Sequence, residues 1–123
     1  MESYWAYARG LYTIGRFFGH TDSLLYIGES YRRIMYDRLY THIREWTNDY
    51  RGDKQVRYGD VLLEDGLRLT EGRLTDIEAL LIYYHQPIHN TQHKNGYWGR
   101  SLVILNEGYR GLLDPIACSD DLW

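Results

Sequence analysis

The sequence is poor in cysteine and in long apolar segments. Cys118 is the only cysteine among the 123 residues, which excludes an intrachain disulfide and a cysteine-rich zinc cluster. No run approaches the roughly 18 apolar residues of a membrane-spanning helix, and the first residues lack the basic and apolar regions of a secretory signal. We therefore expect a cytoplasmic protein with no membrane partner.

The chain also lacks an excess of positive charge. Its formal net charge is −3 at pH 7, whereas proteins that bind nucleic acid usually carry a basic footprint. The charge is uneven, however: residues 1–58 hold nine Lys or Arg against seven Asp or Glu, and residues 59–123 hold five against ten. A local basic patch binds phosphate whatever the total charge, so a nucleic-acid partner stays open.

The length of 123 residues predicts a single domain over residues 1–123. Thirteen tyrosines are an unusual number for this length. Because tyrosine is amphipathic, the excess suits a half-buried sheet, a stacking surface or a site that uses phenols.

The first half of the chain predicts two strands and a helix. Residues 8–15 and 24–28 are expected to be antiparallel strands, joined by a connection over 16–23 that is rich in turn residues. Ser30 is expected to cap the helix that follows, which would run to about residue 48. The helix is indicated by an apolar stripe at helical spacing, formed by Met35, Leu39, Ile43 and Trp46.

The second half predicts a strand over 56–64, then a helix that Thr75 opens and that Pro87 terminates. Leu102–Leu105 is expected to form a strand that pairs with a return near 112–113. The order of elements predicts an α+β fold: a small, mainly antiparallel three-stranded sheet flanked by helices, with a C-terminal hairpin extension.

Several residues whose side chains can bind a metal, bind phosphate or transfer a proton occur in a defined order along the chain. The set comprises Gly10-Leu11-Tyr12, Tyr26-Ile27-Gly28, Arg38 with His42, Glu78, and Asn90 shortly after Pro87. In this order the residues resemble the GIY-YIG nuclease family, whose two strand motifs give it its name. The resemblance covers about residues 8–92 and leaves 93–123 as an extension.

The resemblance implies an enzyme, a metal-dependent endonuclease that hydrolyses phosphodiester bonds in nucleic acid, with DNA favoured over RNA. It also implies that Glu78 is the sole protein ligand of one Mg²⁺ or Mn²⁺. A hard cation with one carboxylate keeps several waters and accepts phosphate oxygen as a ligand. Arg38 would grip the scissile phosphate through its planar guanidinium.

The other residues of the set would activate the water molecule that attacks the phosphate, or would hold the groups that do so. The resemblance implies that Tyr12 or Tyr26 acts as general base, and the sequence leaves open which one. His42 lies four residues after Arg38, hence on the same helical face, and would orient or relay the proton of Tyr12. Asn90 would tie the segment after Pro87 to the site through side-chain hydrogen bonds.

Three features depart from the family pattern. Leu11 stands where the family name has isoleucine, and thirteen residues separate Tyr12 from Tyr26, somewhat more than is common. Glu29 follows the second motif, where many members have lysine or glutamine. An acid there would either repel phosphate or add a metal contact.

Each residue also has a purely structural interpretation. The two tyrosines suit a core position on strands, and Arg38 with His42 suits a solvated helix face. Thr75-x-x-Glu78 matches a capping box, and Asn90 suits a loop position with left-handed backbone. Together with the negative net charge, these interpretations keep a second function open: a non-catalytic module that binds nucleic acid or a partner. The oligomeric state stays open too.

Two further clusters of residues each allow a functional and a structural interpretation. His85, His89 and His93 repeat every four residues, a spacing that binds zinc on a helix, but Pro87 interrupts that helix. Lys94–Arg100 mixes cations, glycines and aromatics, a mixture that either stacks on bases or forms an ordinary surface loop.

Overall fold

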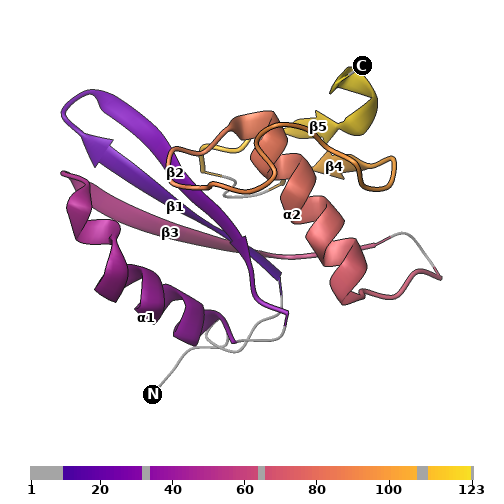
Figure 1. Cartoon of the computed structure of the whole chain (residues 1–123), viewed down its shortest axis with the longest axis horizontal. Coiled ribbons are helices and arrows are strands. Elements are labelled where there is room, and N and C mark those ends of the chain that lie inside the picture. The colour runs from indigo at the N-terminus through magenta and orange to yellow at the C-terminus, as the bar shows by residue number, and fades with distance from the viewer. Residues whose placement is uncertain (1–9, 32–33, 64–65, 108–110, 123) are drawn as a thin grey trace.

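The computed structural model describes residues 10–31, 34–63, 66–107 and 111–122, and it has the predicted α+β class (Figure 1). A three-stranded antiparallel sheet has the order β2-β1-β3. Its strands are β1 (Gly10–Phe18), β2 (Thr21–Glu29) and β3 (Asp53–Asp60). Two helices, α1 (Met35–Glu45) and α2 (Glu71–His85), lie on opposite sides of the sheet.

The β1–β2 hairpin is longer than the sequence suggests. The expected connection over 16–23 is wrong, because β1 continues to Phe18 and β2 resumes at Thr21. Gly19, with φ of 63°, supplies the left-handed backbone of the tight turn between them. Long-range pairing along β1 thus overrides the local turn composition.

A β-bulge interrupts this hairpin beside the two tyrosines. Ile14 pairs with Tyr26 but Gly15 pairs with Leu24, so the register skips Leu25. Leu25 and Tyr26 consequently both face the α1 side, whereas Leu24 and Ile27 pack on the α2 side. Bulges commonly redirect a side chain in this way next to functional sites.

Helix α1 differs from its prediction at both ends. Ser30 is not its N-cap: Ile34 holds that position without a side-chain cap bond, and Ser30 instead hydrogen-bonds Gly10 beside the sheet. Ile43 is 57% exposed, so it does not belong to the buried stripe. The buried positions are Met35, Leu39, His42 and, after the helix, Trp46. A short 3₁₀ helix, η2 (Thr47–Asp49), follows.

Strand β3 and helix α2 both begin earlier than predicted. β3 starts at Asp53, because it pairs with β1 as far as Phe17. The N-cap of α2 is Thr70, whose side chain accepts a hydrogen bond from the Arg73 amide at 3.2 Å. Thr75 therefore lies inside the helix. At the other end, Gln86 adopts left-handed backbone, and Pro87 follows as expected.

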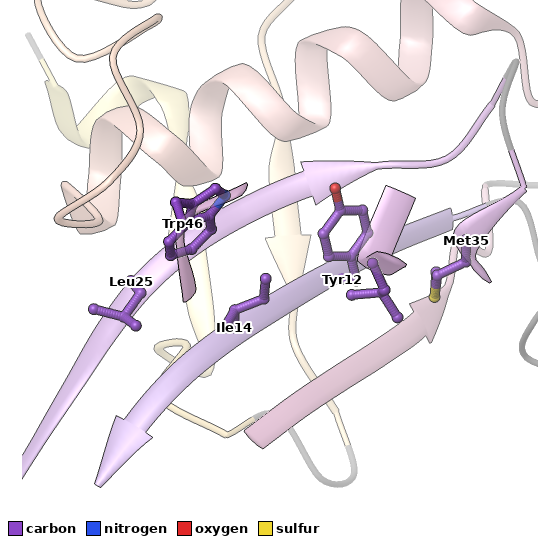
Figure 2. Packing of buried hydrophobic residues seen from close by; sticks show 6 residues of the cluster. Tyr12, Ile14, Leu25, Met35 and Trp46 are labelled. Atoms are coloured by element: carbon purple, nitrogen blue, oxygen red, sulfur yellow. The ribbon is translucent and has the colours of Figure 1, made fainter. Parts of the chain in front are cut away.

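The core is divided between the two faces of the sheet. The α1 face buries Tyr12, Ile14, Leu25, Met35, Leu39 and Trp46 (Figure 2). The α2 face buries Ile27, Ile77, Leu81, Ile82 and Ala117. Each fully buried aliphatic or aromatic side chain stabilises the fold by about 1.5–3 kcal/mol, and this packing holds both helices against the hairpin that carries Tyr12 and Tyr26.

The C-terminal hairpin exists with a different second strand. β4 (Val103–Leu105) matches the predicted strand, but it pairs with β5 (Ile116–Cys118) and not with residues 112–113. A 3₁₀ helix, η3 (Ser119–Leu122), follows. Ala117 of β5 is fully buried against α2. Across the described segments, no helix is long and apolar enough to cross a membrane.

Candidate active site

A cavity of about 380 Å³ brings most of the candidate residues together. It opens between β2, α1, α2 and the segment that follows Pro87. Five candidates line it: Tyr26, Arg38, His42, Glu78 and Asn90. Tyr12, the sixth, lies directly behind His42. Residues far apart in the sequence thus meet at one place.

The two tyrosines lie side by side on β1 and β2. Their ring centroids are 6.1 Å apart, which the bulge at Leu25 makes feasible by turning Tyr26 toward α1. Tyr26 lines the cavity, whereas Tyr12 is only 1% exposed and belongs to the core cluster as well. Gly28 leaves room for them, since a Cβ there would lie 2.4 Å from the Tyr12 hydroxyl oxygen.

His42 is the link between α1 and the tyrosines. Its Nε2 lies 2.7 Å from the hydroxyl oxygen of Tyr12, and its ring centroid lies 4.4 Å from that of Tyr26. The side chain is 7% exposed. The solvated-face interpretation of Arg38 and His42 is therefore wrong for His42, and Arg38 is itself partly buried.

Arg38 points its guanidinium at both phenols. One terminal nitrogen donates to the Tyr26 hydroxyl at 3.4 Å, and the positive charge of Arg38 also acts on the Tyr12 hydroxyl. Its Nε is buried and has no hydrogen-bond partner among the described residues. Leaving a buried donor unsatisfied costs about 1–3 kcal/mol, and the oxygen of a bound anion would remove that cost.

Burial sets the acidity of the two phenols. It raises the pKa of Tyr12 and the pKa of Tyr26 above the ordinary value, and the positive charge of Arg38 opposes the rise in both cases. Without further positive charge, both phenols stay protonated at neutral pH.

Glu78 lies in the interior of α2 and faces the same cavity. Burial raises the pKa of its carboxyl to about 7, and the negative charge of Glu29 raises it further, while Arg38 and the Glu29 backbone N–H act in the opposite direction. The capping-box interpretation of Thr75 and Glu78 is wrong, because the helix begins four residues before Thr75.

The donor set at Glu78 suits a divalent cation. Two carboxyl groups, Glu78 and Glu29, interact across a site in which Arg38 is a neighbouring cation. Among the described residues there is no group of three or more side chains that would enclose a metal. A cation bound by Glu78 would therefore keep water in most of its coordination positions, as Mg²⁺ prefers.

Asn90 holds the cavity wall against the edge of β2. Backbone bonds join Ile88 to Leu24 and His89 to Leu25, at 3.1 and 2.7 Å. The Asn90 side chain continues this ladder: it accepts from the Ile27 amide and donates to the Ile27 carbonyl, both at 2.9 Å. The positive-φ residues outside glycine in the described chain are Gln86 and His93, so Asn90 is not a left-handed loop residue.

A cluster of aromatic side chains beside His42 is not predicted by the sequence analysis. Trp46 stacks on His89 with ring centroids 3.8 Å apart, and the Tyr50 hydroxyl lies 3.1 Å from His89 Nδ1. The indole nitrogen of Trp46 donates to His42 Nδ1 at 2.7 Å. The available signal is the four-residue spacing from His42 to Trp46, whereas the sequence pattern places Trp46 in the apolar stripe, three residues after Ile43.

Of the two other clusters, His89 and His93 line the same cavity, whereas neither His85 nor the Lys94–Arg100 segment does. Both ring nitrogens of His85 are hydrogen-bonded, to the Leu81 carbonyl and to the Asp114 amide, each at 2.9 Å, which leaves no nitrogen free for zinc. In the Lys94–Arg100 segment, Trp98 is 83% exposed and Arg100 forms an ion pair with Asp76.

None of the family models, curated proteins or solved structures compared with the chain matches it.

Proposed function

We propose that the chain is a metal-dependent endonuclease of the GIY-YIG type, which hydrolyses phosphodiester bonds in DNA. One observation carries the proposal: residues from β1, β2, α1, α2 and the segment after Pro87, selected from the sequence for their order, gather around one cavity. The hairpin, helix, strand and helix of residues 10–85 also follow the order expected of that fold.

Arg38 is the group that would bind the scissile phosphate. Its Nε is a buried donor without a partner among the residues that the structure describes, and guanidinium binds phosphate through two parallel N–H groups. Because Arg38 donates to the Tyr26 hydroxyl and its charge acts on both phenols, a phosphate held there would lie next to the groups that transfer the proton.

The phenols would activate the nucleophile. The oxygen of water would attack phosphorus, the bond to the leaving oxygen would break, and one phenol in its phenolate form would take the proton of the water, while the leaving oxygen takes a proton from solvent. The positive charge of Arg38 favours that phenolate form, because it lowers the pKa of both phenols against the rise that burial causes. Tyr26 lies on the cavity wall and meets solvent there, while Tyr12 lies behind it, hydrogen-bonded to His42. General-base catalysis of this kind contributes roughly 10²–10⁴-fold in rate.

Glu78 is the residue that would hold the Mg²⁺ or Mn²⁺ ion, which supplies positive charge to the phosphate when bound. Its carboxylate must lose its proton to do so, and its pKa of about 7 places that step near neutral pH. The charge of Glu29 next to it adds to the attraction for a dication.

The experiment is incubation of supercoiled plasmid, branched DNA and RNA with the protein in Mg²⁺, Mn²⁺ or EDTA. We expect DNA cleavage in either metal and none in EDTA, with cleavage abolished in Arg38→Ala. Cleavage of RNA but not of DNA would show that the substrate is RNA. Binding without cleavage under every condition would contradict the proposal and favour the non-catalytic module, which the net charge of −3 and Glu29 also favour.

A further inference from the structure

The hydrogen bond between Trp46 and His42 determines which nitrogen of the imidazole carries the proton. The indole N–H of Trp46 points at His42 Nδ1 at 2.7 Å. An indole nitrogen is a donor only, so His42 Nδ1 must be the acceptor and must carry a lone pair.

The proton of the imidazole is consequently on the other nitrogen. A neutral histidine has one N–H and one acceptor nitrogen, so the hydrogen of His42 is on Nε2. This atom lies 2.7 Å from the hydroxyl oxygen of Tyr12, and it therefore donates to that oxygen. The positive charge of Arg38 also acts on this hydroxyl and lowers its pKa against the rise that burial causes.

We propose that Trp46 is a positioning residue of the site, which holds His42 in the Nε2–H tautomer so that the imidazole donates to Tyr12. As a role in catalysis, this rests on the proposed nuclease function. The consequence is specific: His42 cannot accept the Tyr12 proton, because its facing nitrogen is already protonated. His42 orients the Tyr12 oxygen as a hydrogen-bond acceptor and turns the hydroxyl hydrogen away from the imidazole.

The surroundings of Trp46 suit this role, because they leave its ring little freedom. The indole is 7% exposed and stacks on His89 at an interplanar angle of 11°. The Tyr50 ring meets its edge at 88°, with centroids 5.8 Å apart. Trp46 follows α1 and Tyr12 lies on β1 (Figure 2). Each of them hydrogen-bonds a different ring nitrogen of His42.

Nuclear magnetic resonance of the ¹⁵N-labelled protein tests the tautomer without any substrate. Long-range couplings in the imidazole ring distinguish a protonated nitrogen from one with a lone pair. We expect a lone-pair shift at His42 Nδ1 and a protonated shift at Nε2 in the wild type. A protonated Nδ1 in the wild type would overturn the proposal, whether or not the protein cuts DNA.

Trp46→Phe removes the N–H and keeps an aromatic ring. We expect the His42 nitrogens to shift toward a mixture of tautomers. Ile14→Val is the control, since it removes buried volume from the same cluster without touching the hydrogen bond. Unchanged nitrogen shifts in Trp46→Phe would overturn the proposal.

Kinetics test the catalytic half of the inference. In Trp46→Phe we expect kcat to fall by up to roughly a hundredfold, because misplacing the base loses at most part of the roughly 10²–10⁴-fold that general acid–base catalysis contributes, with KM little changed. Ile14→Val should retain wild-type kcat. Equal kcat values for Trp46→Phe and Ile14→Val would refute the positioning role. A wild type that cuts nothing would refute the proposed function, while the ring nitrogens would still decide the tautomer.

Discussion

The side chain of Asn90 pairs with both backbone polar groups of Ile27, accepting from the amide and donating to the carbonyl at 2.9 Å each. The amide side chain thereby makes the two hydrogen bonds that a residue of a neighbouring strand would make with the edge of β2. Because Tyr26 precedes Ile27 and His89 precedes Asn90, this pair fixes the distance between the hairpin that carries Tyr12 and Tyr26 and the opposite wall of the cavity.

Asn90→Ala removes both hydrogen bonds. We expect a loss of stability of about 1–3 kcal/mol for each buried backbone group left without a partner, together with faster hydrogen exchange of the Ile27 amide. Asn106→Ala is the control, since Asn106 bonds the Asp114 carbonyl at 2.7 Å on an exposed loop. Equal denaturant midpoints for the two variants would show that the Asn90 pair contributes nothing beyond a surface bond.

Arg38→Lys keeps the positive charge and removes the planar fork. We expect kcat for DNA cleavage to fall roughly 10²–10³-fold, as for the loss of one transition-state donor, while the affinity for DNA changes little. Affinity should be weak and should fall with salt in both proteins, since phosphate contacts release counterions. Arg44→Lys is the control, because Arg44 lies over the exposed ring of Tyr40. If both substitutions reduce kcat equally, Arg38 is not the phosphate clamp.

Gly28→Ala tests the packing of the tyrosine pair. The added Cβ would lie 2.4 Å from the Tyr12 hydroxyl oxygen and 2.8 Å from the Tyr26 ring, so the buried Tyr12 must move. We expect about 1–3 kcal/mol of destabilisation from overpacking, and roughly a hundredfold lower kcat from displacement of the hydroxyl group. Gly59→Ala, whose Cβ would meet nothing within 4 Å, should behave like the wild type. Wild-type kcat in Gly28→Ala would show that the position of Tyr12 is unimportant.

The sequence predicted the class of fold and the gathering of the candidate residues, but not how the residues come together. Order along the chain and helical spacing put Arg38 and His42 on one face, and that is where they lie. The bulge that turns Tyr26 toward the same face was not predictable, because a skipped residue depends on pairing between two strands. A strictly alternating β2 would have placed Leu25 and Tyr26 on opposite faces.

The errors in the helices have a related cause. Ser30 has the chemistry of an N-cap, yet the polar groups of Gly10 across the sheet compete for it. Ile43 is apolar and lies exposed, whereas His42 is buried because Tyr12 and Trp46 satisfy both of its ring nitrogens. A hydropathy pattern treats each side chain separately, so it does not predict the burial of a polar side chain whose hydrogen bonds are satisfied by distant residues.

The pKa of Glu78 predicts how stability depends on pH. The folded value of about 7 exceeds the ordinary 4.5, so between these values the folded state binds more protons than the unfolded state. Stability from this group should therefore fall as pH rises from about 4.5 to about 7, by on the order of 3 kcal/mol. Denaturant titrations from pH 4 to pH 8 on the wild type and Glu78→Gln isolate this contribution, since the variant lacks the group. A constant difference between the two proteins across that range would contradict the raised pKa.

Glu78→Gln separates the metal ligand from a structural role. The amide keeps the shape of the side chain but is a much poorer ligand than a carboxylate for a hard dication. Because Thr70, and not Thr75, caps α2, no helix cap depends on Glu78. We expect cleavage in Mg²⁺ or Mn²⁺ to be lost, while DNA still binds and stability at pH 8 rises as an unfavourable buried charge is removed.

Glu45→Gln is the matched control, because Glu45 lines the same cavity from α1. It should retain cleavage, and Mg²⁺ should raise the Tm of this control and of the wild type at pH 8, since an ion that binds only the folded state stabilises it. Glu78→Gln should show no such rise. If Glu78→Gln cuts DNA at the wild-type rate, or if Mg²⁺ raises its Tm as much as that of the control, then the metal is not held by Glu78. In that case the cation must be sought at Glu29, whose charge faces the same site.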